Sequence, residues 1–493
     1  MASLEELRTT RIEKLEALKA HGIDVYPESV PRDESITELI TYFDRHVASG
    51  AVRSIAGRIV AIRGQGAILF VILQDGKERF QCVFKKDVLG EDILQLFKDT
   101  IDLGDFISVT GTLFTTDRGE RSLLATAWNI ASKALLPLPE KWHGLTDVEE
   151  TYRKRYLDLI SNKETFERFE KRSAIIRAIR KFFDEKGFME IETPILQSQA
   201  GGAMAKTFNT HHNAYDMDMV LRISLELEHK MLMTGGYERI YEIGKNFRNE
   251  GSDPTHIQEF TMIEWYAAYV TLEENMTWTE ELLKHLARDV VNKTEFKVHD
   301  KDGNEVTVDF DAPWQKVAFN NLLKVHAGID MTTASEEMVR EKAQSLGMNR
   351  EEMQKTGIAN VLDFIYKKTA RPLLINPTFV TNYPGGLKPL AKQNTDGTAR
   401  VAQLIIAGAE ITNQYAELID PLVERELLEK QAKAKEGGDE EAMSVDERFL
   451  TAMEHGMPPM TGFGMGIDRL VALLTEQNNL RDTIFFPIVR PKE

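Results

Sequence analysis

The densest concentration of chemically active side chains lies in the segment NFRNEGSDPTHIQEFTMIEW, residues 246–265. Its charged and aromatic members include Arg248, Glu250, His256, Phe260 and Glu264. The flanking residues alternate as in β-strands, so side chains two positions apart point to the same face. An arginine binds oxyanions through paired N–H donors, and a carboxylate accepts hydrogen bonds from an amine. The segment therefore predicts a hairpin that holds a phosphate, a purine and an amine. The alternative is a surface hairpin with incidental ion pairs.

Two further segments supply matching chemistry, GAEITNQYAELIDP at residues 408–421 and TGFGMGIDRLVALL at residues 461–474. In the first, strand alternation places together Asn413, Tyr415 and Glu417, with Glu410 nearby. The second has glycine at every second position of a strand, followed by Arg469 at the start of an apolar helix. Such glycines allow a backbone or a flat ligand to approach closely. The spacings GxGxxG and GxxxxGKS/T do not occur here, which argues against Rossmann and P-loop nucleotide sites.

The amino-acid composition limits the classes of protein to which the chain can belong. The chain has 493 residues, 42% of them apolar, so two or three domains with sizeable cores are expected. A net charge of −17 argues against a protein that holds nucleic acid by bulk charge alone. The single cysteine, Cys82, excludes an internal disulfide framework, and no Cys/His spacing suggests zinc. Without a signal peptide or an apolar run of about 20 residues, we expect a cytoplasmic protein that does not enter membranes.

Five short strand patterns between residues 54 and 135, separated by turn-rich breaks and one helical pattern, predict a closed barrel of the OB type. Such barrels bind single-stranded nucleic acid through basic and aromatic surfaces, and Arg63, Phe70 and Gln81 are candidates for that surface. The alternative is a purely structural barrel. Residues 1–22 predict an amphipathic helix whose exposed positions include Arg8, Arg11, Lys14 and Lys19.

The remaining residues mix helices and strands without regular βαβ alternation, which predicts an α+β domain with an antiparallel sheet flanked by helices. A long helix closed by Gly187 precedes MEIETPIL, interpreted as a strand carrying Pro194. We expect an N-terminal helix and barrel at 1–140, a linker at 141–160 and a second domain at 161–493. That second domain has a helical insertion near 335–370.

These motifs together resemble a known family. Arg248-Asn249-Glu250 with Phe260, the run GFGMGIDR and the run MEIETPIL are similar to the three signature motifs of class II aminoacyl-tRNA synthetases. The resemblance narrows to bacterial-type lysyl-tRNA synthetases through GRIVAIRGQG, WHGLTDVEETYRKRYLDLI, THHNAYDMDMVLRIS and MPPMTGFGMGIDR. It spans nearly the whole chain.

The resemblance implies an ATP-dependent, homodimeric lysine–tRNA ligase that activates L-lysine as its adenylate and transfers it to tRNA(Lys). It implies catalytic roles for Arg248 and Arg469. The ATP-binding residues that it implies are Arg248, Glu250, His256, Phe260, Glu410 and Arg469. Glu410 would also hold Mg²⁺, and the barrel residues Arg63, Phe70 and Gln81 would contact the tRNA anticodon. The segment around Pro194 would form the subunit interface.

For the lysine pocket the resemblance implies a set of residues around three acids. They are Gly202, Glu226, Arg248, Glu264, Tyr266, Asn413, Tyr415 and Glu417. Glu226 would face the α-amino group, and Glu417 with Tyr266 would face the ε-ammonium group. A buried ammonium needs hydrogen-bond acceptors, so such a pocket rejects neutral side chains.

Four positions depart from the family pattern. Gln403 stands where a second metal-binding glutamate is usual, and in YPGGLKPLAK, residues 383–392, Gly386 replaces the glutamate of YPxExSPL. The loop THIQEF has Thr255 in place of the arginine of RHNPEF, and Ala127 replaces an acidic anticodon contact.

Rival functions remain open from the sequence. One is a synthetase paralogue that lysylates a protein such as elongation factor P, although those paralogues lack the barrel. Another is a catalytically idle RNA-binding or regulatory protein, suggested by the altered Gln403 and loop. Aspartyl and asparaginyl ligases share the architecture but need a cationic or a neutral pocket.

Overall fold

A computed structural model of the chain describes residues 3–64, 66–139, 147–203, 205–300, 303–388, 390–436 and 445–491. It divides into two compact units, Met1–Glu167 with Ile488–Glu493, and Arg168–Pro487. Of the expected linker at 141–160, residues 141–146 lie outside the described part. The rest of it forms helices α6 (Val148–Arg153) and α7 (Arg155–Ser161).

The first unit contains the five-stranded barrel that the sequence predicts. Its strands are β1 (Val52–Arg63), β2 (Ile68–Asp75), β3 (Glu78–Lys85), β4 (Phe106–Thr115) and β5 (Arg121–Ser132). They close in the order β1-β2-β3-β5-β4, with β4 pairing back onto β1. Alternate residues such as Val71, Leu73 and Cys82 fill the interior. The accompanying helices are α2 (Ile36–Thr41), α3 (Phe43–Ser49), α4 (Lys86–Leu89) and α5 (Glu91–Thr100).

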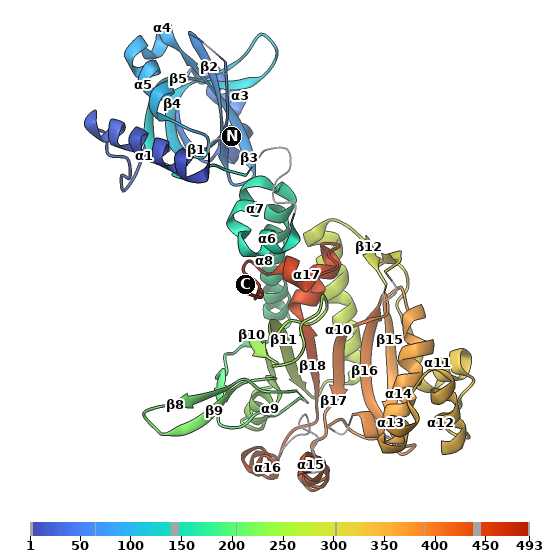
Figure 1. Cartoon of the computed structure of the whole chain (residues 1–493). Coiled ribbons are helices and arrows are strands. Elements are labelled where there is room, and N and C mark those ends of the chain that lie inside the picture. The colour runs from blue at the N-terminus through green and yellow to red at the C-terminus, as the bar shows by residue number, and fades with distance from the viewer. Residues whose placement is uncertain are drawn as a thin grey trace. The chain divides into compact units, whose positions relative to one another are not determined.

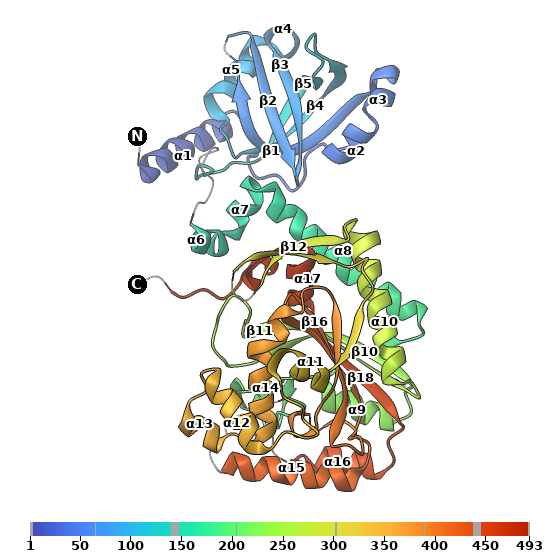
Figure 2. The ribbon, with the colours of Figure 1, turned by 90° about the vertical axis from the view of Figure 1, so that its right-hand side faces the viewer.

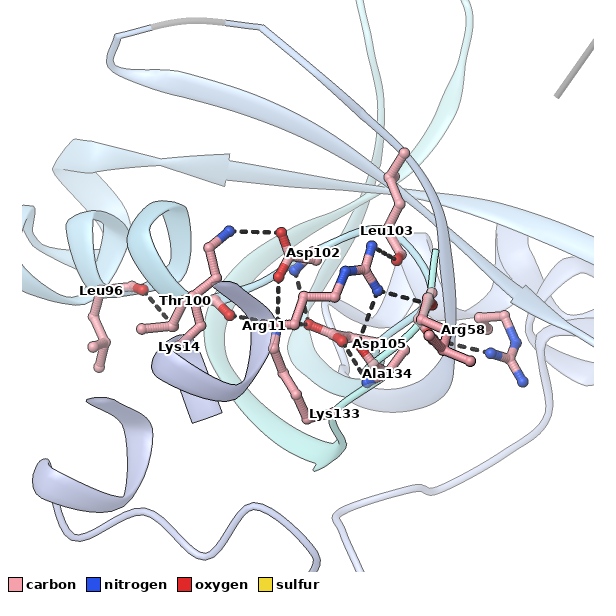
Figure 3. Close-up of polar contacts among 12 residues, drawn as sticks. Arg11, Lys14, Arg58, Leu96, Thr100, Asp102, Leu103, Asp105, Lys133 and Ala134 are labelled. Atoms are coloured by element: carbon pink, nitrogen blue, oxygen red, sulfur yellow. Dashed lines mark hydrogen bonds and ion pairs between the residues drawn. The ribbon is translucent and has the colours of Figure 1, made fainter. Parts of the chain in front are cut away.

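Helix α1 (Leu4–Ala20) is bound to the barrel through polar contacts that the sequence interpretation missed. Arg11 was predicted to be exposed but is buried, and its guanidinium donates to the carbonyl oxygens of Leu103, Ala134 and Leu136. Figure 3 shows this arrangement beside the buried ammonium of Lys133. The Lys133 Nζ atom lies 2.7 Å from Asp105 and 2.6 Å from Asp102. Main-chain carbonyls and the partly exposed ion pair of Lys14 with Asp102 thus anchor the helix, whereas amphipathic patterning reports only apolar contacts.

The second unit is built on an eight-stranded sheet in the order β14-β15-β16-β17-β18-β11-β10-β6 (Figure 1). Its strands are β6 (Met189–Glu190), β10 (Arg239–Phe247), β11 (Glu259–Ala268), β14 (Gln315–Ala318), β15 (Thr378–Pro384), β16 (Thr398–Ile406), β17 (Ala409–Ala416) and β18 (Met460–Gly466). All neighbours pair antiparallel except β10 with β6 and β14 with β15. The predicted α+β class, an OB-type barrel followed by a largely antiparallel sheet with helices, is confirmed.

Strand alternation separates the two faces of this sheet. In β11 the side chains of Ile263, Trp265 and Ala267 enter the main core, whereas Glu264 and Tyr266 point to the opposite face. The core is completed by α8 (Lys163–Glu185), α10 (Leu272–His285) and α17 (Ile467–Leu474). These helices cover the apolar face, and the polar side chains of β11 lie on the opposite face.

The remaining α-helices of the second unit are α9 (Glu226–Thr234), α11 (Phe319–Ala327), α12 (Glu336–Ser345), α13 (Arg350–Lys355), α14 (Ile358–Thr369), α15 (Pro421–Glu436) and α16 (Glu447–Glu454). They fall into three groups: α9 packs on β11, α11 to α14 lie beside β14 and β15, and α15 and α16 lie below the strands (Figure 2). Short strands form two small sheets, β7 (Leu196–Gln197) with β8 (Asn209–His212) and β9 (Met217–Leu221), and β12 (Glu295–His299) with β13 (Glu305–Asp309). Within the described residues, no helix is long and apolar enough to cross a lipid bilayer.

The segment MEIETPIL differs from its predicted single strand. Only Met189–Glu190 pairs with β10, and the chain leaves the sheet before Pro194, pairing again at Leu196–Gln197 with β9. Proline lacks the N–H that a continuous ladder requires, which explains the interruption.

The buried ion pair of the first unit leads to a stability prediction. Lys133→Met leaves the fully buried Asp105 without its ammonium partner and should destabilise the barrel by about 3–5 kcal/mol. Hydrogen exchange of the β4 amides measures this change locally. Lys14→Met, which removes only the partly exposed pair with Asp102, is the control and should change stability by less than about 1 kcal/mol. Equal effects of the two variants would contradict the account.

Candidate active site

Three neighbouring strands form the floor of the site. Gly462 of β18 lies opposite Tyr415 of β17 on one side and Tyr266 of β11 on the other. Gly464 lies in the same way between Asn413 and Glu264. Residues directly opposite each other in adjacent strands point to the same face, so these four side chains converge over a strip of glycine.

Position 462 has no room for a side chain larger than that of glycine. A Cβ atom there would lie 2.0 Å from Glu417 Oε1 and 2.6 Å from Tyr266 Cε1. The glycines noticed in the sequence therefore leave room for the acids and rings of their neighbours, in addition to any ligand.

A cleft opens beside this strip, with about 810 Å³ of space including its mouth. The predicted residues that line it are Arg248, Glu250, His256, Phe260, Glu410, Asn413 and Arg469. The structure thus brings together every residue that the resemblance assigned to ATP. Arg248 lies over the Phe260 ring, with 5.3 Å from the guanidinium carbon to the ring centroid. Arg469 donates to the main-chain oxygen of Glu410 at 2.7 Å.

The loop that departs from the family pattern at Thr255 has a hydrogen-bonded cluster of its own. Asp253 accepts hydrogen bonds from the main chain and hydroxyl of Thr255 at 2.6 and 2.7 Å, and its other oxygen lies 2.9 Å from His256 Nδ1. Although burial opposes them, these hydrogen bonds lower the pKa of Asp253 to about 2. The loop therefore holds the His256 ring against a carboxylate at the rim of the cleft.

The second part of the site is a group of buried acids. Glu264, Glu417 and the less buried Glu226 come from β11, the end of β17 and the start of α9. Glu264 accepts hydrogen bonds from the Ser224 hydroxyl and the Leu225 amide, each at 3.2 Å, and from Tyr266 at 3.3 Å. Burial raises the pKa of Glu264. Gly202, with a φ of +78°, packs beside Glu226, where a Cβ would lie 2.8 Å from the Glu226 Cβ.

Lys230 connects two of these acids, and sequence analysis missed it. Its Nζ atom lies 2.6 Å from Glu226 Oε1 and 2.6 Å from Glu417 Oε2, and its side chain is 1% exposed. Burial lowers the pKa of this ammonium, but Glu226 and Glu417 more than compensate, so its pKa lies above the ordinary value. The other oxygen of Glu417, Oε1, is buried and has no hydrogen-bond partner among the described residues. It is the acceptor that remains for a ligand. The only hint in the sequence was a Glu–Lys spacing of four, which usually marks a surface pair.

Glu424 of α15 is a second residue of the pocket that sequence analysis missed. It is 1% exposed, and its Oε2 atom has no hydrogen-bond partner among the described residues. Burial raises its pKa to about 7, against an opposing contribution from Lys230. Burial likewise raises the pKa of Glu417, with Lys230 opposing and Glu226 adding to the effect. The pocket thus holds more carboxylates than its one ammonium can neutralise.

Gln403 joins Glu410 to Asn413 in a small network. Its Nε2 atom donates to Glu410 Oε2 at 2.9 Å and to Asn413 Oδ1 at 2.6 Å, and Asn413 Nδ2 donates to Glu410 Oε1. Glu410 is therefore the only carboxylate of this network. Within the part of the chain that the structure describes, no group of three His, Cys, Asp or Glu side chains is arranged to hold a metal ion.

The predicted tRNA-binding residues lie in the other unit. Arg63 and Phe70 are direct partners on β1 and β2, and Gln81 of β3 lies opposite Ile72. By strand alternation they share the outer face of the barrel, where Arg63 is exposed. Gln81 already donates to the Ser122 hydroxyl at 2.8 Å.

Comparison with known proteins agrees with this geometry. Residues 147–490 match the family of class II tRNA synthetases (D, K and N), and residues 54–131 match the OB-fold nucleic acid binding domain. The chain therefore belongs to the class II tRNA synthetases.

Three relatives that are similar over nearly their whole length are lysine–tRNA ligases. The chain is 42% identical to the lysine–tRNA ligase of Carboxydothermus hydrogenoformans, with 99% of both chains covered. It is 42% identical to that of Enterococcus faecalis over 99% of both chains. It is 43% identical to that of Lactococcus lactis subsp. lactis, over 99% of this chain and 100% of the relative.

The raised pKa of Glu424 predicts a pH-dependent stability. Between its ordinary pKa near 4.5 and about 7, the folded state binds a proton that the unfolded state has released, so the free energy of unfolding falls as pH rises through this window. Glu424→Gln cannot ionise and should gain stability relative to the unaltered protein by up to about 3 kcal/mol between pH 5 and pH 8.5.

Hydrogen exchange of the α15 amides at both pH values measures this gain. Glu429→Gln, at an exposed position of the same helix, is the control and should show no pH-dependent difference. A gain that is the same at both pH values would show that Glu424 is ionised throughout.

Proposed function

We propose that the protein is a lysine–tRNA ligase that activates L-lysine with ATP and transfers it to tRNA(Lys). The observation that carries this proposal is the free, buried Oε1 of Glu417 in a cluster of acids that adjoins a cleft lined by Arg248 and Arg469. The full-length likeness to lysine–tRNA ligases supports it.

In the first step the carboxylate of lysine attacks the α-phosphorus of ATP, a bond to the α-phosphate forms and pyrophosphate leaves. In the second, a hydroxyl of the terminal ribose of tRNA attacks the lysyl carbonyl, and AMP leaves. Neither step needs a protein nucleophile. The protein contributes by aligning the reactants and by neutralising the charge that builds up on the phosphorus oxygens.

The cationic cleft is assigned to ATP. Arg248 would bridge the α-phosphate and the lysine carboxylate, since its guanidinium can donate to both. Phe260, already beneath Arg248, would stack on the adenine, and Glu250 would accept from the adenine amino group. His256 and Arg469 would bind the γ-phosphate.

The acid cluster is assigned to lysine. Glu226 would accept from the α-ammonium, together with the backbone at Gly202, and Glu417 with Tyr266 would accept from the ε-ammonium. Glu264, Asn413 and Tyr415 complete the walls. Because each buried carboxylate is stabilised by an ammonium, a neutral side chain would leave it unpaired and would be rejected.

Magnesium is the metal that the family implies, and the residues fit it in a limited way. Mg²⁺ is usually held by one or two carboxylates together with substrate phosphates and water. Glu410 supplies one carboxylate at the wall of the cleft, so it would hold a Mg²⁺ ion that arrives with ATP. The ion supplies positive charge to the phosphates.

The barrel is assigned to the tRNA anticodon. Phe70 offers a stacking surface and Arg63 a cation on the same outer face, which is the combination that single-stranded nucleic acid requires. The presence of the barrel disfavours the protein-lysylating paralogues, and the intact acid cluster disfavours a catalytically idle protein.

A homodimer is proposed through the segment around Pro194. Apolar side chains are exposed there, including Met189, Ile195 and Leu196 at 49%, 40% and 46%. An exposed apolar group of this kind is typical of a surface that a partner covers.

Lysine-dependent exchange of pyrophosphate into ATP tests the proposed reaction. We expect exchange with L-lysine and none with L-aspartate or L-asparagine, because only lysine brings an ammonium to the free oxygen of Glu417. Exchange stimulated by aspartate would overturn the pocket assignment. No exchange with lysine at adequate Mg²⁺ and protein concentration would overturn the ligase itself.

Glu417→Gln tests the role of the central acid. Removing its charge should raise the KM for lysine by on the order of 100-fold, while the KM for ATP stays within about twofold. Glu429→Gln should leave both constants unchanged. Parallel loss of lysine and ATP affinity in Glu417→Gln would mean that Glu417 is structural.

A further inference from the structure

Lys388 is a charged group near the cleft that the assignments above do not use. It follows a short turn, Gly385–Leu387, at the end of β15, and its side chain is partly buried. Its Nζ atom lies 5.8 Å from the ring centroids of both Tyr383 and Tyr415. No carboxylate of the described residues lies within ion-pair distance, and its one polar contact among them is Asn413 Oδ1, at 3.4 Å. An ammonium has three donors, so most of its hydrogen-bonding capacity is free.

Asn413, which contacts Lys388, is part of the wall of the cleft. Asn413 Oδ1 accepts from Gln403 as well as from Lys388, and the two amides in turn donate to the oxygens of Glu410. Asn413 and Glu410 both line the cleft, which also contains Arg248 and Arg469. Lys388 therefore contacts the wall of the cleft through Asn413, on the side where Glu410 lies.

The balance of charge around Glu410 is unusual for a site that depends on several metal ions. Gln403, which donates to Glu410, is neutral where the sequence pattern discussed above has an acid, and Lys388 is a cation where YPxExSPL has serine. Relative to that pattern these two positions are two charges more positive. Each missing carboxylate weakens the binding of a divalent cation, whereas a fixed ammonium stabilises phosphate oxygens without a metal.

We infer that Lys388 supplies the phosphates of ATP with a fixed positive charge that replaces part of the divalent metal, so that one metal ion at Glu410 suffices. This inference rests on the proposed function for the identity of the nucleotide. Lys388 acts as a positioning residue, through Asn413 and by its charge, and no covalent step involves it. Burial lowers the pKa of Lys388, whereas the nearby carboxylates Glu410 and Asp363 favour its charged form, and the tyrosine rings hold the ammonium by cation–π attraction.

Four variants separate the charge of Lys388 from its packing. Lys388→Ser restores the residue of the pattern, and Lys388→Arg keeps the positive charge. Gln403→Glu restores one acid, and the double variant Lys388→Ser with Gln403→Glu restores both features. Thermal unfolding shows which of them fold. If Lys388→Ser does not fold, Gln403→Glu still adds a carboxylate beside an intact Lys388, so the inference remains testable.

The first measurement counts metal ions without any reaction. Mn²⁺ binding is followed by electron paramagnetic resonance in the presence of α,β-methylene-ATP, which cannot be cleaved at the α-phosphate. We expect one bound Mn²⁺ per active site in the unaltered protein and in Lys388→Arg, and at least one more in the double variant. Two or more ions in the unaltered protein would overturn the inference.

The second measurement is the Mg²⁺ concentration that gives half-maximal lysine-dependent exchange. Lys388→Ser should raise it by on the order of tenfold, because the lost charge has to be replaced by metal, and Lys388→Arg should change it by less than about twofold. An unchanged Mg²⁺ dependence in Lys388→Ser would contradict the inference. A lower KM for lysine as the sole effect of Lys388→Ser would also contradict the inference, because Lys388 would then act on the amino-acid pocket.

The two proposals fail in different ways. If exchange with lysine is absent while Mn²⁺ and the ATP analogue bind with the expected stoichiometry, the proposed function fails and the role of Lys388 stands. If exchange is normal but the metal count and the Mg²⁺ dependence do not respond to Lys388, only the present inference fails.

Discussion

The site depends on how this protein keeps several carboxylates buried on one face of a sheet. An isolated buried charge is strongly destabilising, and a carboxylate in such a place either takes up a proton or finds a cation. Lys230 is the resident cation, held 2.6 Å from both Glu226 and Glu417. It occupies one oxygen of each acid and thereby fixes where the other oxygens point. Among the described residues the Oε1 atom of Glu417 has no hydrogen-bond partner, and we propose that a substrate ammonium supplies one.

The glycines of β18 make this arrangement sterically feasible. A side chain at Gly462 would occupy the space of the Glu417 carboxylate and the Tyr266 ring. On the other face of the same strand, Phe463 stacks on Trp265 in the main core, with 3.2 Å between ring centroids. Strand β18 is therefore fully packed on its apolar side, whereas its glycines carry no side chain on the polar side. The helices that cover the apolar face hold the floor of the site, and the proposed ligand site lies on the other face.

The fold and the residues on strands could be predicted because strand periodicity is simple. Alternation with a period of two placed Glu264 with Tyr266 and Asn413 with Tyr415, and the structure has them on a common face. Lys230, Glu424 and Lys388 could not be found in this way. Each lies on a helix or turn whose position is set by tertiary packing, and a charged residue in such a segment is ordinarily exposed. Arg11 was misjudged for the same reason, because its partners are carbonyl groups about 90 to 125 residues away.

The central claim is that buried carboxylates select a substrate by its side-chain ammonium. Calorimetric titration of L-lysine and of 6-hydroxy-L-norleucine, its neutral analogue of similar length, tests this claim directly when α,β-methylene-ATP is present. We expect lysine to bind at least about 10³-fold more tightly, a difference of about 4 kcal/mol, because the hydroxyl analogue can donate one hydrogen bond to Glu417 but brings no positive charge. Affinities within threefold of each other would show that the acid cluster has a structural role and that the selection of lysine lies elsewhere.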